Sequence, residues 1–193
     1  MLESSPIFIA EISCNHNGSI NNAKKLIIEA KKAGADYVKL QTYTANTMTI
    51  KSDFKDFKIK KGLWKNKNLW ELYTKAQTPF EWQKELFNFA KKNKIKCFST
   101  PFDETAVDLL QKLNCPLYKI SSFEINHLPL IKKVALLKKP MIISTGTANL
   151  SEIDDAFKVA KKYGCPDITL LYCVSSYPAQ PEDFNLNNIQ IMK

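Results

Sequence analysis

Short apolar segments alternate with amphipathic segments along most of this chain, and no other feature limits the possible folds as strongly. The apolar segments have the length and composition of strands, and they cover residues 7–12, 36–42, 95–100, 116–121, 140–145 and 167–174. Between them, apolar residues recur at helical spacing. Nearly continuous apolar strands separated by helices favour a parallel sheet built of βα units.

Capping signals mark where most of the expected helices begin. Ser19 precedes a helical pattern that ends near Gly34, and Asp103 stands where it can cap the next helix after residue 100. Residues 78–81 (TPFE) and 149–152 (NLSE) each have the spacing of a capping box. The proline in the first of these suits the first helical position. A further helix is expected over residues 128–137.

Polar residues stand at the carboxyl end of every expected strand, and they decide between two ways of arranging the sheet. No G-x-G-x-x-G turn follows any strand, so the best sign of an open, doubly wound dinucleotide fold is missing. A ring of polar groups at one end of consecutive parallel strands is typical of a (β/α)8 barrel. We therefore expect an α/β fold of the TIM-barrel type. The ring consists of Glu11, Lys39, Gln41, Ser99, Thr100, Lys119, Ser122, Glu124, Ser144, Thr145, Ser175 and Tyr177.

The length predicts that the barrel is incomplete. A whole (β/α)8 barrel takes about 250 residues, whereas the 193 residues here provide six expected strands. We expect residues 1–193 to form the amino-terminal part of a barrel, with about six βα units present and the remaining units absent.

Composition narrows the classes of partner. The formal net charge is +9, yet all 28 basic residues are lysines. Arginine supplies the bidentate guanine contact and the planar phosphate fork, so its absence argues against a role that reads nucleic-acid sequence. No apolar stretch reaches the ~18 residues of a membrane span, and no signal peptide is recognisable. Five cysteines form no C-x-x-C pair. We expect reduced thiols, a cytoplasmic location and no membrane association.

The connection from Tyr43 to Gln77 interrupts the βα rhythm. Loops of this length in compact domains are usually functional or disordered. Residues 51–67 carry seven lysines against two aspartates, interleaved with Phe54, Phe57 and Trp64. Three interpretations stay open: a solvated basic loop anchored by its aromatic residues, a cover over an anionic site, and a nucleic-acid stripe.

Two lysines lie inside strand-like segments and require an explanation. In DYVKLQTY (residues 36–43), the strand period places Val38 and Leu40 on one face and Lys39 on the other. Lys119 stands similarly within LYKIS (residues 117–121). A buried ammonium is costly unless an anionic group meets it, although the side chain can instead extend from the strand end into water. Two lysines with hydroxyls at corresponding strand ends favour an anion-binding site.

Six motifs together resemble the sialic-acid synthase family. They are AEISCNHNGS, VKLQTYT, FSTPFDE, YKISSFE, ISTGTA and YCVSSYP, and they follow the family's order and spacing across essentially all 193 residues. The segments KKGLW, LWELYTKAQTP and YCVSSYP look closest to the pseudaminic acid synthase branch. The sialic-acid branch usually has an asparagine where this chain has Ser175.

The resemblance implies a barrel transferase that forms a carbon–carbon bond. Such an enzyme condenses phosphoenolpyruvate with an N-acetylated aminosugar to give a nine-carbon nonulosonic acid and phosphate. The branch implies 2,4-diacetamido-2,4,6-trideoxy-altrose as the acceptor and pseudaminic acid as the product. The alternative within the family is sialic or legionaminic acid, made from a mannosamine-type acceptor.

The resemblance also implies roles for single residues. Lys39 and Lys119 look like the lysines that hold phosphoenolpyruvate. Hydroxyl ligands of its phosphate are implied at Thr100, Ser122 and Ser144, and positions near the sugar are implied at Glu11, Gln41, Glu124, Ser175 and Tyr177. Glu11 and Glu124 are the expected catalytic residues; Glu124 could stabilise cationic character or handle a proton, or it could simply pair with Lys119. His16 is either catalytic or structural, because Asn and Gly in its N-H-N-G motif suit a tight turn.

Two features of the family have no counterpart in this sequence. Family members use a divalent cation, typically manganese, held by two histidines after the sixth strand, and they form homodimers in which an antifreeze-like domain supplies an arginine to the partner's site. Neither His16 nor His127 occupies those positions, and the chain has no arginine. We therefore expect no metal ligands within these residues and no activity from residues 1–193 alone. Two other classes stay open: an aldolase that forms a Schiff base on Lys39 or Lys119, and a basic anion- or nucleic-acid-binding module without catalysis.

Overall fold

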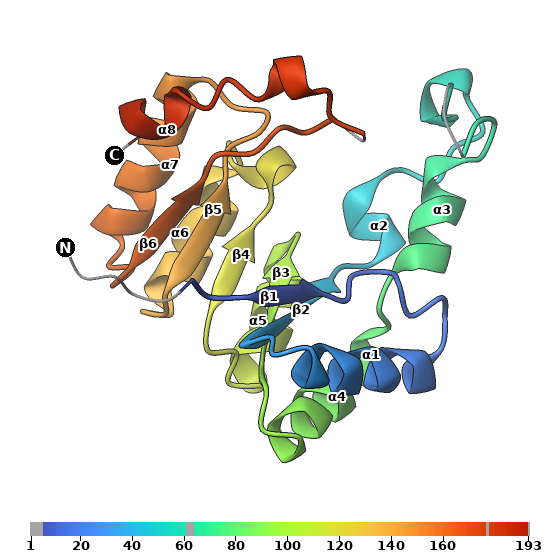
Figure 1. The fold of residues 1–193 in the computed structure, drawn as a ribbon. Coiled ribbons are helices and arrows are strands. Elements are labelled where there is room, and N and C mark those ends of the chain that lie inside the picture. The colour runs from blue at the N-terminus through green and yellow to red at the C-terminus, as the bar shows by residue number, and fades with distance from the viewer. Residues whose placement is uncertain (1–5, 61–63, 177, 193) are drawn as a thin grey trace. The chain divides into compact units, whose positions relative to one another are not determined.

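The computed structural model describes residues 6–60, 64–176 and 178–192, and the chain folds as two compact units, Met1–Ser99 and Thr100–Lys193 (Figure 1). The first unit contains β1 (Ile9–Glu11), α1 (Ile20–Lys32), β2 (Tyr37–Thr42), α2 (Ala45–Met48), η1 (Lys55–Phe57), α3 (Leu69–Ala76), α4 (Phe80–Lys92) and the start of β3 (Lys96–Pro101). The second contains α5 (Glu104–Lys112), β4 (Tyr118–Ile120), η2 (Ser122–Glu124), α6 (Leu128–Leu136), β5 (Met141–Ser144), α7 (Leu150–Lys162), β6 (Ile168–Leu171), η3 (Pro181–Asp183) and α8 (Asn188–Ile191). Within these ranges no helix is long and apolar enough to cross a membrane.

The strands are hydrogen-bonded in the order in which they occur along the chain, β1–β2–β3–β4–β5–β6. β1 pairs with β2, β4 with β5, and β5 with β6, each time in parallel. A doubly wound sheet reverses its strand order at a switch point, whereas a (β/α)8 barrel keeps consecutive strands adjacent. The order therefore confirms the prediction of consecutive βα units of the barrel type. The sixth strand is shorter than the predicted 167–174, because it ends at Leu171.

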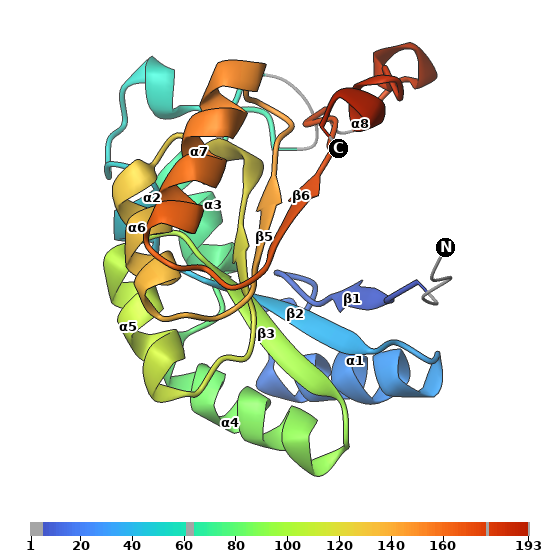
Figure 2. The ribbon, with the colours of Figure 1, turned by 90° about the vertical axis from the view of Figure 1, so that its left-hand side faces the viewer.

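The core of the first unit lies between the sheet and the helices α1 and α4, which lie side by side (Figures 1 and 2). β2 alternates as the strand period predicts, since Val38 and Leu40 are fully buried while Lys39 is half-buried on the opposite face. Ala23 and Ile27 of α1 are one helical turn apart and both buried against this core. Full burial of a side chain such as Ile or Leu contributes about 1.5–3 kcal/mol.

The second unit has its own core around β4 and β5. Figure 2 shows α6 and α7 side by side, on the same side of β5. Tyr118 and Ile143 in the strands and Ile131 in α6 are fully or almost fully buried. Ala156 and Ala160 of α7 are also fully buried and one turn apart, and their small side chains let this helix approach its neighbours closely.

Three of the predicted helix caps are present, and one prediction is wrong. Ser19 and Asp103 accept hydrogen bonds from backbone N–H groups in the first turns of α1 and α5, and residues 149–152 form the complete capping box at α7. At α4, however, the N-cap position is Pro79 and no side chain caps the helix. The Thr78 hydroxyl instead contacts the His16 ring, with 3.1 Å between Oγ1 and Nε2.

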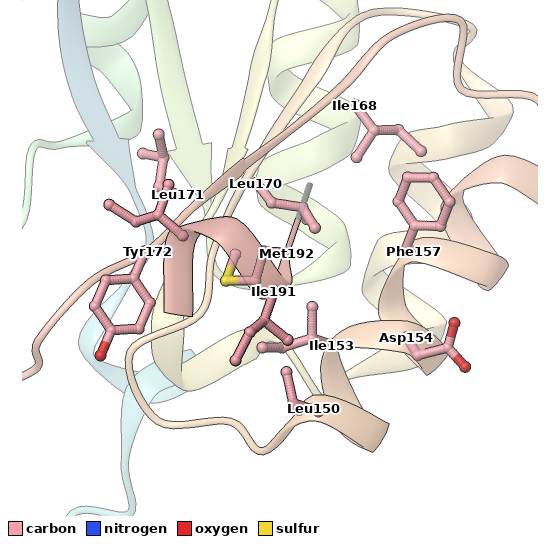
Figure 3. Close-up of a pocket in the computed structure, with 11 residues that line it drawn as sticks. Leu150, Ile153, Asp154, Phe157, Ile168, Leu170, Leu171, Tyr172, Ile191 and Met192 are labelled. Carbon is pink, nitrogen blue, oxygen red and sulfur yellow. The ribbon is translucent and has the colours of Figure 1, made fainter. Parts of the chain in front are cut away.

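An apolar groove of about 740 Å³ runs along the second unit, between α7, β6 and the segment that includes α8 (Figure 3). Ile153 and Phe157 line it from α7, Leu170 lines it from β6, and Ile191 and Met192 close it from the other side. Asp154 is the one acidic residue in its lining among the residues described. The groove therefore carries none of the polar groups expected of the predicted site.

Candidate active site

Glu11, the last residue of β1, forms an ion pair with Lys39 in the middle of β2. Their Cα atoms are register partners in the parallel ladder. The Lys39 side chain is 16% exposed and that of Glu11 is 42% exposed. Lys39 therefore does not extend freely into water, and a carboxylate compensates its charge. A second oxygen of Glu11 accepts a hydrogen bond from the backbone N–H of Ser13 at 3.1 Å, which fixes the carboxylate at the strand end.

Gln41, the next outward-facing residue of β2, is half-buried. Its backbone carbonyl accepts a hydrogen bond from the Gln83 side chain of α4 at 3.1 Å. The adjacent Thr42 is buried, and its hydroxyl lies 2.6 Å from that of Ser99 within β3. This hydroxyl contact joins the neighbouring strands β2 and β3. Ser99 was singled out from the sequence, but Thr42 was not.

Thr100 is placed in the second unit and is 2% exposed. Its hydroxyl oxygen makes no hydrogen bond to any residue that the structure describes. Buried polar groups are almost always paired, and leaving one unpaired costs about 1–3 kcal/mol. The role of Thr100 as a hydroxyl ligand of phosphate stays a prediction.

Lys119 is the centre of the polar cluster in the second unit. It lies on β4 and is only 8% exposed, and its ammonium donates hydrogen bonds to the carbonyl of Ile120 at 2.9 Å and to the hydroxyl of Ser144 at the end of β5. The Cys173 thiol donates to the same Ser144 hydroxyl at 3.3 Å. The structure therefore brings together two of the predicted residues, Lys119 and Ser144, on neighbouring strands.

Ser122 and Gly146 extend this cluster. The backbone N–H of Gly146 donates to the Ser122 hydroxyl at 3.2 Å, and the Thr147 hydroxyl donates to the Ser122 carbonyl at 2.5 Å. A Cβ atom on Gly146 would lie 2.9 Å from the Cys173 carbonyl oxygen and would also collide with the hydroxyl of Ser175. Only glycine permits this approach between the segments after β5 and β6. Gly146 was missed by sequence reasoning, although its place in the ISTGTA motif could have drawn attention to it.

Glu124 lies in η2, directly after the end of β4. Burial raises the pKa of its carboxyl group to about 7, although a backbone hydrogen bond and the positive charge of Lys119 both act to lower it. The Ser121 hydroxyl donates a hydrogen bond to one of its oxygens. A carboxyl group with a pKa near neutrality can both give and take a proton under physiological conditions. Tyr177 lies outside the described residues.

His16 has the environment of a structural residue. It is fully buried, the Gly18 N–H donates to its Nδ1 at 3.1 Å, and its ring meets that of Trp82 edge-on at 5.6 Å between centroids. Because Nδ1 accepts, the proton must be on Nε2, which therefore donates to Thr78. Burial lowers the pKa of His16, which favours this neutral form. His127, in contrast, is exposed and precedes α6.

The residues described here do not fit a manganese site. No three His, Cys, Asp or Glu side chains among them come together as metal ligands. Both ring nitrogens of His16 are already engaged. The divalent cation expected of the complete enzyme stays a prediction.

A family model described as the NeuB family matches residues 26–193, which is most of the chain. The chain belongs to the NeuB family. It is 50% identical over 181 residues to the pseudaminic acid synthase of Helicobacter pylori, an alignment that covers 94% of this chain and 53% of that protein. It is 42% identical over 190 residues to the N,N'-diacetyllegionaminic acid synthase of Campylobacter jejuni, covering 97% of this chain and 57% of that one.

The same relationship appears among solved structures. The N-acetylneuraminic acid synthetase of Leptospira borgpetersenii, solved in complex with citrate, superposes with a TM-score of 0.83 and 32% sequence identity. That match covers 97% of this chain and 61% of the other. The NeuB chain described here thus spans about half the length of the curated relatives it matches.

Proposed function

We propose that the full-length protein condenses phosphoenolpyruvate with an N-acetylated aminosugar to give a nonulosonic acid and phosphate. The observation that carries this proposal is the cluster around Lys119, in which a buried ammonium and the Ser144 hydroxyl meet at neighbouring strand ends. The identity of 50% to a pseudaminic acid synthase supports it. A phosphate group accepts several hydrogen bonds, and charge-assisted bonds from an ammonium are the strong ones.

The substrate carries a phosphate and a carboxylate, and the chain offers two lysines to compensate them. Lys119 would bind one anionic group, with Ser122, Ser144 and Thr100 as hydroxyl partners. Lys39 would bind the substrate by exchanging its Glu11 partner for a substrate oxygen. Gln41, Ser175 and Tyr177 would contact the sugar, which is neutral and is recognised by hydrogen bonds alone.

The bonds change as follows. The C3 carbon of phosphoenolpyruvate attacks the aldehyde carbon of the open-chain sugar, forming the new carbon–carbon bond. The aldehyde oxygen takes up a proton and becomes a hydroxyl. Positive charge develops at C2, water adds there and loses a proton, and the C2–O bond to phosphate breaks while the new C2 hydroxyl loses its proton to give the ketone. Glu124 is the group we assign to this centre, because its ionised form opposes the positive charge and its pKa of about 7 allows it to accept a proton. Glu11 is the second proposed catalytic carboxylate.

The acceptor we propose is 2,4-diacetamido-2,4,6-trideoxy-altrose, with pseudaminic acid as product. Identity to two pseudaminic acid synthases is 50% and 45%, compared with 42% to a legionaminic acid synthase. A mannosamine-type acceptor is the second candidate, since these sequence identities differ by only a few percentage points. A homodimer and a cytoplasmic location stay predictions.

The test is an assay of the full-length protein with phosphoenolpyruvate, a divalent cation and each candidate sugar. Release of phosphate together with a nine-carbon product, seen by mass spectrometry with the altrose-type sugar, is the expected result. A lysine adduct trapped by borohydride would instead indicate an aldolase. Salt-dependent retention on DNA, without affinity for phosphoenolpyruvate, would indicate a nucleic-acid-binding module.

A further inference from the structure

Residues 44–77, which we call the insertion, follow directly from the carboxyl end of β2. Figure 1 shows α2 and α3 of this segment beyond the arrowheads of β1 and β2. Glu11, which forms the ion pair with Lys39, is the last residue of β1. The insertion belongs to the same compact unit as these two strands. The insertion therefore begins at the end of β2 and lies in the same unit as the ion pair.

The described part of the insertion is held together by specific hydrogen bonds. Asn68 is buried; its carbonyl oxygen caps α3 by accepting from the Trp70 N–H at 2.8 Å, and its amide donates to the Ser52 carbonyl. The Trp70 indole donates to Asn46 of α2 at 2.7 Å. The Gln77 side chain accepts from the Ala45 N–H at 3.1 Å, joining the two ends of the segment. These bonds thus fix parts of the insertion relative to one another.

The aromatic residues expected to anchor the insertion do not all do so. Phe54 is 78% exposed and Trp64 is 51% exposed, whereas Phe57 is half-buried. Trp70 and Tyr73 are the half-buried aromatics of α3, and the Tyr73 ring meets that of Tyr43 edge-on at 5.9 Å. The interpretation that Phe54, Phe57 and Trp64 anchor the loop is therefore wrong for Phe54 and Trp64.

The insertion carries a concentrated positive charge. Residues 51–67 contain seven lysines and two aspartates. Lys55, Lys58 and Lys67 are exposed, and none of the three forms an ion pair within the part of the chain that the structure describes. Lys51 lies over the Trp70 ring, with its ammonium 4.6 Å from the ring centroid. A group of uncompensated charges of one sign produces a local field that attracts counter-ions.

We propose that the insertion is an electrostatic collector for phosphoenolpyruvate: its exposed lysines raise the local concentration of this anion at the ends of β1 and β2 without contacting it in the bound state. This inference rests on the proposed function. Lys39 is already compensated by Glu11, so its own charge attracts little at a distance. Attraction between exposed charges acts over a Debye length of about 30 Å at 0.01 M salt and about 3 Å at 1 M. The contribution of the insertion must therefore disappear at high salt.

The test compares two triple variants of the full-length protein that lose equal charge. One is K55Q/K58Q/K67Q in the insertion. The other is K31Q/K91Q/K92Q, in the last turns of α1 and α4, which lead back to the opposite ends of the strands. Phosphoenolpyruvate binding is measured by titration calorimetry at about 10 mM and about 1 M monovalent salt, and circular dichroism checks that both variants fold.

The insertion variant should bind phosphoenolpyruvate about five- to tenfold more weakly at low salt and less than twofold more weakly at high salt. The affinity of the matched variant for phosphoenolpyruvate should change by less than twofold at both salt concentrations. The KM for the neutral sugar should be unchanged in both variants. An equal loss of phosphoenolpyruvate affinity in the two variants, or a loss that persists at high salt, would contradict the proposal that the insertion collects this anion. Absence of phosphoenolpyruvate binding by the unmodified protein, or binding that Lys119→Ala leaves intact, would overturn the proposed function itself.

Discussion

Glu11, at the carboxyl end of β1, and Lys39, in the adjacent parallel strand β2, stand side by side and form an ion pair. If Lys39 binds phosphoenolpyruvate, the substrate must compete with Glu11 for the ammonium. Glu11→Gln should therefore bind phosphoenolpyruvate about two- to fivefold more tightly, since a partly exposed pair contributes up to about 1 kcal/mol. Its kcat should fall, because the proposed catalytic carboxylate is lost.

Steady-state kinetics separates these two effects. Glu29→Gln is the control, since Glu29 is exposed and, among the residues described, pairs with its helix neighbour Lys32 alone, at 2.8 Å. A higher KM for phosphoenolpyruvate in Glu11→Gln would contradict competition for Lys39.

Loss of either site lysine should weaken phosphoenolpyruvate binding much more than sugar binding. A hydrogen bond to a charged group is worth about 1.5–3 kcal/mol, so Lys39→Ala and Lys119→Ala should each lower the affinity by about one to two decades. Titration calorimetry measures both ligands, and the exposed Lys84→Ala on α4 provides the control. Unchanged affinity in both variants would remove these lysines from the site.

Glu124 should make stability and activity depend on pH near neutrality. Its folded-state pKa of about 7 lies above the ordinary value of 4.5, so the folded state holds this proton more tightly than the unfolded state does. The group therefore costs stability progressively as the pH rises from about 4.5 to about 7, and the full cost applies above that. Glu124→Gln should raise the free energy of unfolding by about 1–2 kcal/mol at pH 8, after allowance for solvent screening, and by little at pH 4.5.

The same variant should lose most of its kcat while its KM for phosphoenolpyruvate changes little. Urea denaturation at the two pH values and steady-state kinetics check the two parts separately. A stability gain that is equal at both pH values would show that ionisation of Glu124 is not its cause.

His16 should be required for stability in its neutral form. Its replacement by Asn removes two buried hydrogen bonds and the contact with Trp82, which should cost about 2–4 kcal/mol at pH 8. Burial lowers the folded-state pKa of His16 below 6.5, so its contribution is complete above that pH and is lost as the pH falls from about 6.5 towards the folded-state value. The difference between the two proteins should narrow by pH 5.5 in urea denaturation.

The exposed His127 supplies the matched control. His127→Asn should change the free energy of unfolding by less than about 0.5 kcal/mol at either pH. If His16→Asn were as stable as the unmodified protein but inactive, the histidine would be catalytic rather than structural.

Gly146 should not tolerate even one added methyl group. The Cβ of Gly146→Ala meets the Cys173 carbonyl and the Ser175 hydroxyl, so the two segments must separate, at a cost of about 1–3 kcal/mol. Phosphoenolpyruvate affinity should fall as well, because the Gly146 N–H then leaves Ser122. Adding Ser175→Ala to this variant should restore part of the affinity, since one of the two collisions is removed. Normal binding by Gly146→Ala alone would contradict the role of this close approach.

Much of the fold follows from local patterns. The period of two in DYVKLQTY predicts that Val38 and Leu40 are buried and Lys39 is not, because successive side chains of a strand point to opposite faces. NLSE predicts the capping box of α7, because all its bonds lie within four residues. The consecutive βα units can likewise be predicted from the order of strand-like and helix-like segments along the chain.

TPFE has a similar local pattern, yet it does not cap α4, because the Thr78 hydroxyl is taken by a histidine 62 residues earlier. The partners of the two site lysines are also non-local: Lys39 meets Glu11 through strand register, and Lys119 meets Ser144 across 25 residues. The sequence by itself determined the elements, their order and the residue types at the strand ends, since these depend on short-range geometry. Only the tertiary structure decided which of those polar groups meet and which are neutral, because register, packing and burial bring distant side chains together and shift their pKa values.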